Sequence, residues 1–297
     1  MRSRPTLEWA PGPEVLALEP GSTDVGPVAE VVAAGGVVVL SGAGISTESG
    51  IPDYRGESGS LRTHTPMTYG DFQGSEQARQ RYWARSHLGW RTIARAAPND
   101  GHRAVAALQA RGYLSGIITQ NVDGLHQAAG ARDVIELHGN LDRIICLDCG
   151  TTSPREVLDL RLRAANQAFT AEATRINPDG DVELPEDVVR TFRVVPCTVC
   201  GGVLKPDVVF FGENVPKSRV QRCYQLIDHA NAVLVLGSSL TVMSGFRFVR
   251  HAAKAGKQVL IINQGLTRGD PYAAQRVNLP LGQALTELLN TTGPSHA

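Results

Sequence analysis

Short apolar runs that are rich in β-branched residues recur along this chain, and each is followed by a glycine or a polar residue. The runs lie at 37–40, 117–119, 134–137, 233–236 and 259–262. Near-continuous apolar runs are typical of strands that are covered on both faces, as in a parallel sheet. Segments with a helical pattern separate the runs, at 101–111, 216–230 and 245–255. This alternation predicts an α/β fold with a doubly wound, Rossmann-like parallel sheet.

Two regions interrupt the alternation, and both are predicted to be insertions into the sheet domain. Residues 57–97 begin with a Gly-Ser-rich stretch and continue as a helical insertion, whereas residues 143–204 carry two pairs of cysteines and are predicted to form a small zinc-binding domain. The sheet domain then comprises three stretches of chain, 24–56, 98–142 and 205–292. Ligands of such sheets bind at the carboxyl ends of the strands, so the polar residues after each run mark the expected site.

The balance of charge limits the classes of partner. The chain has 297 residues, and its 29 basic side chains equal its 29 acidic ones in number. This balance gives no electrostatic reason to expect nucleic acid or a membrane surface as a partner. No apolar run approaches the length of a membrane span, and residues 1–20 have neither the apolar core of a secretion signal nor the texture of a transit peptide. We therefore expect a cytoplasmic protein, whose oligomeric state the sequence leaves open.

Four of the five cysteines form two Cys-x-x-Cys pairs, Cys146/Cys149 and Cys197/Cys200. In a chain without a secretion signal, such pairs favour a metal site over disulfides, and two matched pairs fit a redox dithiol poorly. Four thiolates complete the tetrahedral set of zinc and leave no position open for water, so the ion would be structural. Cys223 lies in a predicted helix and is expected to be a small buried side chain.

A glycine-rich loop follows the first predicted strand. Gly42 and Gly44 would let the backbone approach a phosphate, and the next turn would present free N–H groups to it. Gly-x-Gly also occurs in simple tight turns. The dehydrogenase fingerprint requires a third glycine where this chain has Thr47, and an acidic residue that closes a second strand about 20 residues later, which is missing. The loop therefore predicts a dinucleotide site that is not built for hydride transfer.

The loop is the first of six motifs that follow one another along the chain. They are GAGISTESGIPDYRG (42–56), TQNVDGLH (119–126), ELHG (136–139), KPDVVFFGE (205–213), GSSL (237–240) and NQG (263–265). In this order, and with the cysteine pairs between the third and fourth, they resemble the sirtuin (Sir2-like) family over about residues 24–285. The texture around 81–85, 179–181 and 210–214 is similar to the class II branch, which includes bacterial members.

The resemblance implies an NAD-dependent protein-lysine deacylase (deacetylase), which is a transferase. In this family the amide oxygen of an acyl-lysine attacks the ribose C1′ of NAD, and nicotinamide leaves. A general base then promotes transfer of the acyl group to the ribose, which yields free lysine and an acyl-ADP-ribose. The resemblance thus implies NAD as cofactor, one structural zinc ion, and acylated proteins as substrates.

His138, Asn121 and Asp123 are the candidate catalytic residues. His138 follows a predicted strand, and an imidazole that titrates near neutrality can accept the proton of a ribose hydroxyl. Asn121 and Asp123 would hold the nicotinamide ribose for attack, although Asp123 also fits an Asx turn or a helix N-cap. His102 fits a packing or capping role, and His126 is not favoured for chemistry.

The resemblance places the NAD contacts in several segments that follow strands. Asp53 would contact the nicotinamide carboxamide, Arg55 the pyrophosphate, residues 237–239 a phosphate and ribose, and Asn263 the adenine ribose. A surface ion pair is the alternative for Asp53 and Arg55. The expected contacts with NAD are Ser41, Gly42, Ala43, Gly44, Ile45, Thr47, Ile51, Asp53, Tyr54, Arg55, Gln120, Asn121, Asp123, Gly237, Ser238, Ser239, Asn263, Gln264, Gly265 and Leu281.

Residues 208–211 are expected to be extended, to line an acyl-lysine channel and to pair with the substrate peptide as an added strand. A buried core strand is the alternative. The expected substrate contacts are Val208, Phe210, Phe211 and Gly212. Sirtuins that prefer acidic acyl groups carry a Tyr and an Arg three residues apart after the cofactor loop, and residues 57–65 lack that pair. This disfavours succinyl and malonyl groups and leaves the acyl group otherwise open.

Other functions remain open at the same site. A protein mono-ADP-ribosyltransferase, a lipoamidase or a long-chain deacylase would use the same NAD pocket. A non-catalytic module that binds NAD or ADP-ribose is the alternative from a different class. The presence of His138 together with Asn121 and Asp123 disfavours that module, because a binding module does not need a base.

Overall fold

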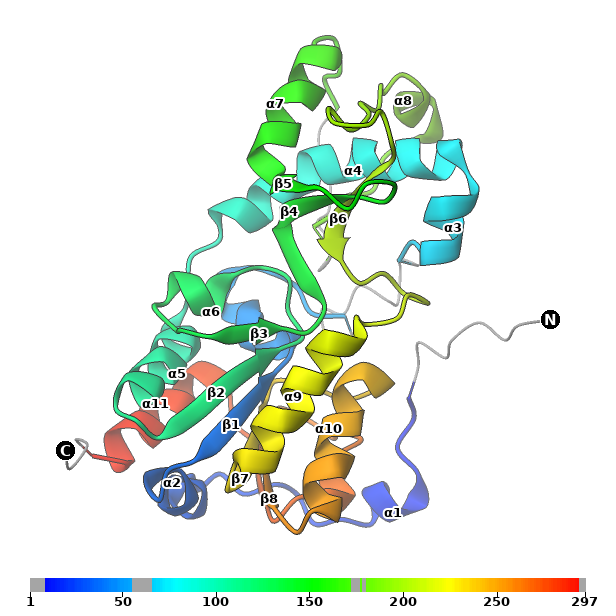
Figure 1. The fold of residues 1–297 in the computed structure, drawn as a ribbon. Coiled ribbons are helices and arrows are strands. Elements are labelled where there is room, and N and C mark those ends of the chain that lie inside the picture. The colour runs from blue at the N-terminus through cyan, green and yellow to red at the C-terminus, as the bar shows by residue number, and fades with distance from the viewer. Residues whose placement is uncertain (1–8, 55–65, 172–176, 178–179, 294–297) are drawn as a thin grey trace.

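Two sheets organise the molecule, which is described by a computed structural model over residues 9–54, 66–171, 177 and 180–293. One sheet is parallel and six-stranded, and the other is antiparallel and three-stranded (Figure 1). The short helices outside the main layers are α1 (Pro13–Leu16), α6 (Leu125–Ala128) and η3 (Asp270–Tyr272). Within the described ranges, no helix combines the length and the apolar character that crossing a bilayer requires.

All five runs that were predicted as strands are strands of the six-stranded sheet. The spatial order is β3 (Val134–Glu136), β2 (Leu114–Thr119), β1 (Val37–Ser41), β7 (Ala232–Leu236), β8 (Gln258–Ile262) and β9 (Gln275–Val277). Every neighbouring pair is parallel. Strand β9 was not predicted, because it has three residues and only Val277 among them is fully buried.

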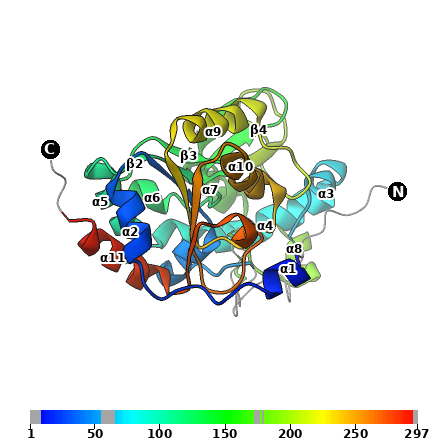
Figure 2. The ribbon, with the colours of Figure 1, turned by 90° about the horizontal axis from the view of Figure 1, so that it is seen from below.

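Helices cover both faces of this sheet, which explains why its strands are apolar along their whole length. Val37 and Val39 of β1 belong to one hydrophobic core, and Val38 and Leu40 belong to the other. Figure 2 shows the helices of the two cores on opposite sides of the sheet. They are α2 (Gly26–Ala33), α5 (Asp100–Ala110) and α11 (Leu281–Thr291) on one side, and α9 (Lys217–His229) and α10 (Met243–Lys254) on the other. The predicted doubly wound fold is confirmed.

The direction in which the sheet grows reverses at β1. From β1 the chain adds β2 and β3 on one side, and it later adds β7, β8 and β9 on the other. The loops after β1 and β7 therefore depart in different directions, and a crevice opens at the carboxyl ends of these strands. The short helix η1 (Ala43–Ser49) follows β1 there, and α10 follows β7.

A smaller part of the molecule contains residues of both predicted insertions. Its sheet has the order β5 (Thr152–Pro154), β4 (Gly139–Cys146), β6 (Leu204–Val208). The helices beside it are α3 (Tyr69–Gly74), α4 (Glu76–Arg95), α7 (Arg155–Ala165) and α8 (Glu186–Arg190) (Figure 1). Trp83 of α4 is buried and donates its indole N–H to the carbonyl of Leu204 at 3.2 Å. Two regions far apart in sequence thus share one core, while the domain boundaries proposed from the sequence stay predictions.

Candidate active site

A cavity of about 790 Å³ lies where the loops after β1, β2, β7 and β8 meet the segment after β6. Most of the residues that the sequence analysis singled out line it. They are Gly42, Ala43, Gly44, Ile51, Asp53, Tyr54, Gln120, Asn121, Asp123, His138, Val208, Phe210, Phe211, Gly212, Gly237, Ser238, Ser239, Asn263, Gln264 and Gly265. Their gathering follows from the parallel sheet, because the carboxyl ends of parallel strands share one edge.

Four expected NAD contacts do not line this cavity. Ser41 is buried and bonds Thr119 and His126 through its hydroxyl. Ile45 and Leu281 belong to the hydrophobic core between the sheet and α11. Thr47 is exposed and donates its hydroxyl to the carbonyl of Gly44 at 2.9 Å. Arg55 and the stretch 57–65, on which the acyl-group argument rests, lie outside the described residues.

The glycines of the cofactor loop pack against the loop after β7. Gly44 donates its N–H to the carbonyl of Gly237 at 2.9 Å. A Cβ added to Gly44 would lie 2.9 Å from that same oxygen, and one added to Gly42 would lie 2.7 Å from the Cβ of Ser238. Both glycines are therefore required by the contact between the two loops, whether or not a phosphate approaches them.

A buried serine connects the polar residues that follow β2. Asn121 donates its side-chain N–H to the Ser46 hydroxyl at 2.9 Å, and Ser46 donates to Asp123 Oδ2 at 2.7 Å. Asp123 Oδ1 accepts the N–H of Leu125 at 3.0 Å, which is the Asx turn that the sequence left open. Burial raises the pKa of the Asp123 carboxyl. Ser46 was not predicted as a site residue, although it lies within the first motif.

His138 is held by hydrogen bonds to both of its ring nitrogens. Nδ1 lies 2.9 Å from the carbonyl oxygen of Gln120, and Nε2 lies 2.8 Å from the hydroxyl of Ser244. A carbonyl oxygen can only accept, so Nδ1 carries the hydrogen and Nε2 accepts from Ser244. Burial lowers the pKa of His138 to about 4, and the nearby cations Arg219 and Arg247 act in the same direction. The imidazole is therefore neutral near pH 7, with Nε2 as its basic atom.

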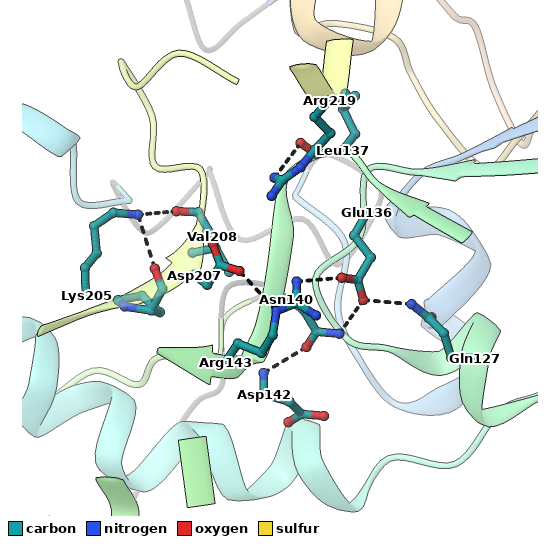
Figure 3. A network of polar contacts seen from close by, with 11 residues as sticks. Gln127, Glu136, Leu137, Asn140, Asp142, Arg143, Lys205, Asp207, Val208 and Arg219 are labelled. Atoms are coloured by element: carbon teal, nitrogen blue, oxygen red, sulfur yellow. Dashed lines mark hydrogen bonds and ion pairs between the residues drawn. The ribbon is translucent and has the colours of Figure 1, made fainter. Parts of the chain in front are cut away.

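The residues next to His138 in the chain are fixed from several sides, and Figure 3 shows the contacts of Glu136, Leu137 and Arg143 among them. Gly139 has a φ of 87°, and a side chain at this position would overlap the carbonyl oxygen of Asp207. Arg143 pairs with Glu136 at 2.7 Å and with Asp207 at 3.0 Å, so it joins the residues before His138 to β6. Arg219 donates to the carbonyl of Leu137 at 3.2 Å. The position of the histidine is thus set by contacts from β4, β6 and α9.

The segment after β6 forms the opposite wall of the cavity. Phe210 packs against Phe72 and Tyr82, with ring centroids 5.2 Å apart in each pair. Phe211 accepts the N–H of Tyr69 at its carbonyl at 2.9 Å. The segment therefore lines the cavity and also packs into the core of the smaller part, but its strand β6 ends at Val208, so the interpretation of 208–211 as a core strand holds only for the first residue. Its pairing with a substrate peptide stays a prediction.

The four paired cysteines form a cluster that can hold a zinc ion. Their sulfur atoms all lie within 4.8 Å of one another. The distance from Cys146 to Cys200 is 3.5 Å, and the distance from Cys149 to Cys197 is 3.9 Å. Four sulfurs at about 2.3 Å from a tetrahedral zinc would be about 3.8 Å apart, so the donor set and its spacing fit zinc. None of the four lines the cavity, which agrees with a structural ion.

Comparison with known proteins decides the family. The family model of the Sir2 family matches residues 42–244 of this chain. The chain belongs to the Sir2 family. The sirtuin resemblance of the six motifs is thereby confirmed.

The most similar sirtuins include two bacterial proteins, each named NAD-dependent protein deacetylase. The protein from Streptomyces coelicolor is 65% identical over 99% of this chain and 97% of its own length. The protein from Bordetella bronchiseptica is 48% identical over 85% of this chain and 92% of its own length. A solved Sir2 complex with a p53 peptide and NAD+ has a TM-score of 0.72 at 27% identity, and the match covers 90% of this chain and 98% of that one.

Two histidines of this sirtuin are buried next to serines of the first strand and its loop, His102 beside Ser46 and His126 beside Ser41. His102 completes the capping box of α5 with Asn99, as the sequence analysis anticipated, and its Nε2 lies 3.4 Å from the Ser46 hydroxyl. The rings of His102 and His126 meet edge to face, with centroids 5.1 Å apart. Burial lowers the pKa of His102 to about 4 and that of His126 to about 3. Both rings are therefore neutral in the folded sirtuin.

These two histidines are expected to make the fold sensitive to mild acid. In the unfolded chain each would titrate near 6.5, so between pH 6.5 and the folded values the unfolded state binds more protons. The contribution of the neutral rings to the free energy of unfolding is complete above pH 6.5. It is lost as the pH falls toward the folded pKa values of about 4 and about 3, by up to about 1.4 kcal/mol per pH unit for each ring. Denaturant unfolding at pH 7 and pH 5 measures this slope.

The variant His126→Gln should show a shallower fall in the free energy of unfolding between pH 7 and pH 5. His229→Gln is the matched control, because His229 is exposed near the end of α9. A slope that His126→Gln and His229→Gln leave equally unchanged would contradict the role assigned to the buried ring.

Proposed function

We propose that this Sir2-family protein is an NAD-dependent protein-lysine deacylase in which His138 is the base. The observation that carries the proposal is the state of His138, a neutral imidazole with a defined basic atom at the wall of the cavity. The named deacetylases among its relatives, which match 99% and 85% of this chain, support the same reaction.

The cavity fits NAD in size and in the character of its walls. Its volume of about 790 Å³ lies within the usual range for cofactor sites. When bound, NAD supplies an electrophilic ribose carbon and a good leaving group. Asn121 and Asp123 would hold the ribose, Asp53 the carboxamide, and Asn263 with Gln264 the adenosine end. The cysteine cluster would hold zinc as a structural ion.

Acylated protein segments are the proposed substrates. A Sir2 structure that contains a p53 peptide with NAD+ supports a peptide as the second substrate. In this chain the peptide would lie along the segment after β6, with its acyl-lysine between Val208 and Phe210 and directed toward His138. The wall of that channel is apolar and aromatic, which suits an uncharged acyl group such as acetyl. A location in the cytoplasm stays a prediction.

A panel of acyl-lysine peptides with NAD tests the proposal. We expect nicotinamide release that depends on the acyl-lysine and equals the loss of acyl mass from the peptide, with acetyl or a longer neutral chain preferred over succinyl. Addition of ADP-ribose mass to protein without loss of the acyl group would favour the transferase instead. No release with any peptide would favour a binding module.

A further inference from the structure

We propose that Ser244 is a positioning residue for His138, which holds the ring with Nε2 as the basic atom. The inference rests on the proposed function, since it concerns the same base. Ser244 belongs to none of the six motifs and was not expected to have a role. Its hydroxyl lies 2.8 Å from Nε2, and the Gln120 carbonyl lies 2.9 Å from Nδ1.

The two hydrogen bonds select one state of the ring. The neutral imidazole has one N–H and one lone pair, and a flip of the ring by 180° about its Cβ–Cγ bond would exchange nitrogens for carbons at both contacts. The Gln120 carbonyl accepts the Nδ1 hydrogen, and the Ser244 hydroxyl donates to Nε2. Without Ser244 only one of these contacts would oppose the flip.

The first turn of α10 places Ser244 and also secures Gln120. This helix begins at Met243, directly after residues 240–242, which line the cavity. Gly245, the residue after Ser244, leaves room for the Gln120 side chain, because a Cβ at position 245 would overlap the amide oxygen of Gln120. Gln120 in turn donates its amide to Ser238 at 2.9 Å. Ser244 thus contacts the ring itself, and its neighbour Gly245 accommodates the side chain of the residue whose backbone carbonyl contacts Nδ1.

A hydroxyl suits this position because it has one donor hydrogen and two acceptor lone pairs. Before the reaction, Ser244 donates to Nε2. During proton transfer, Nε2 would take up the proton of the ribose hydroxyl in place of the hydrogen bond from Ser244, and the electron pair of the broken O–H bond would stay on the ribose oxygen for its bond to the acyl carbon. Afterward, Ser244 can turn and accept the hydrogen of the charged ring. An alanine could do neither.

Ser244→Ala is expected to slow deacylation without slowing the step that precedes proton transfer. Release of nicotinamide needs no base, so exchange of labelled nicotinamide into NAD in the presence of acyl-peptide should stay within about twofold of the unmodified protein. Turnover to free lysine should fall roughly fivefold to tenfold, the size expected for one lost hydrogen bond. Ser244→Thr keeps the hydroxyl and should restore turnover to within about twofold.

Ser218→Ala is the matched control, because it makes the same change at an exposed position in the first turn of α9. Exchange in the same sample reports an intact NAD site, so a folding defect would be visible. The proposal is overturned if Ser244→Ala turns over like Ser218→Ala, or if exchange and turnover fall together and Ser244→Thr does not restore them. Failure of the proposed function appears earlier, as absence of acyl-dependent nicotinamide release by the unmodified protein.

Discussion

Replacing His138 by alanine is expected to lower the rate of deacylation by about 10²- to 10⁴-fold, the range for loss of a positioned general base. The ring lies at the cavity wall, and burial keeps it neutral by lowering its pKa to about 4. Its loss removes the acceptor for the ribose proton, while the binding of NAD should persist. Turnover of an acetyl-lysine peptide, followed by mass spectrometry at saturating NAD, measures the effect.

The control for this variant is His229→Ala, since His229 is exposed on α9 and lies outside the cavity. The two variants should bind ADP-ribose alike and differ only in turnover. If His138→Ala kept more than about a tenth of the turnover, His138 would not be the base. If it kept transfer of ADP-ribose to protein, the transferase would be the better description.

Removal of zinc is expected to have the second large effect, on the fold itself. The cluster of four cysteines joins the end of β4 and the turn after it to the turn before β6, so a bound ion would hold one end of the three-stranded sheet together. Structural zinc in small metal-binding folds is worth about 10–16 kcal/mol, which exceeds the stability of many whole domains. Cys149→Ser should therefore lose the metal, unfold the smaller part, and disorder the segment after β6, where the substrate is proposed to bind.

One zinc per chain by elemental analysis, and a fall of the melting temperature on chelation, would support this prediction. Cys223→Ala is the matched control, because this cysteine is buried in α9 among apolar residues. This variant should keep the zinc, and its stability should fall only by the small packing loss of one removed sulfur atom. A metal-free protein with unchanged melting temperature and activity would contradict a structural role for the ion.

The sequence predicted the sheet well, for a reason that lies in the fold. A strand of a doubly wound sheet is covered on both faces, so its residues are apolar without interruption, and five such runs could be recognised. Strand β9 was not predicted, because three residues with one buried side chain show no hydrophobic pattern. The packing of α4 against the cysteine region was not predicted either, because Trp83 and Leu204 lie far apart in the sequence and no local pattern relates them.

The motifs located the candidate site, but not every residue that was named as an NAD contact lines the cavity. Residues that follow strands could be named because parallel strands end at one edge, and most of them line one cavity. Ser41, Ile45 and Leu281 do not, because they are buried in the fold, and Thr47 does not, because it is exposed and bonds the carbonyl of Gly44. Their contacts with NAD remain predictions.

The sequence by itself determined the class of fold, the family, and the residue types available for NAD, zinc and proton transfer, since these depend on local pattern and spacing. Only the tertiary structure decided which ring nitrogen of His138 is basic, that Ser46 bonds Asp123, and that the Ser244 hydroxyl lies beside His138. It also decided that Arg155 is buried with its guanidinium over the rings of Trp83 and Trp90. Protonation states and side-chain partners depend on burial and on atoms from distant segments. Those distances are set when the chain has folded, and no local pattern records them.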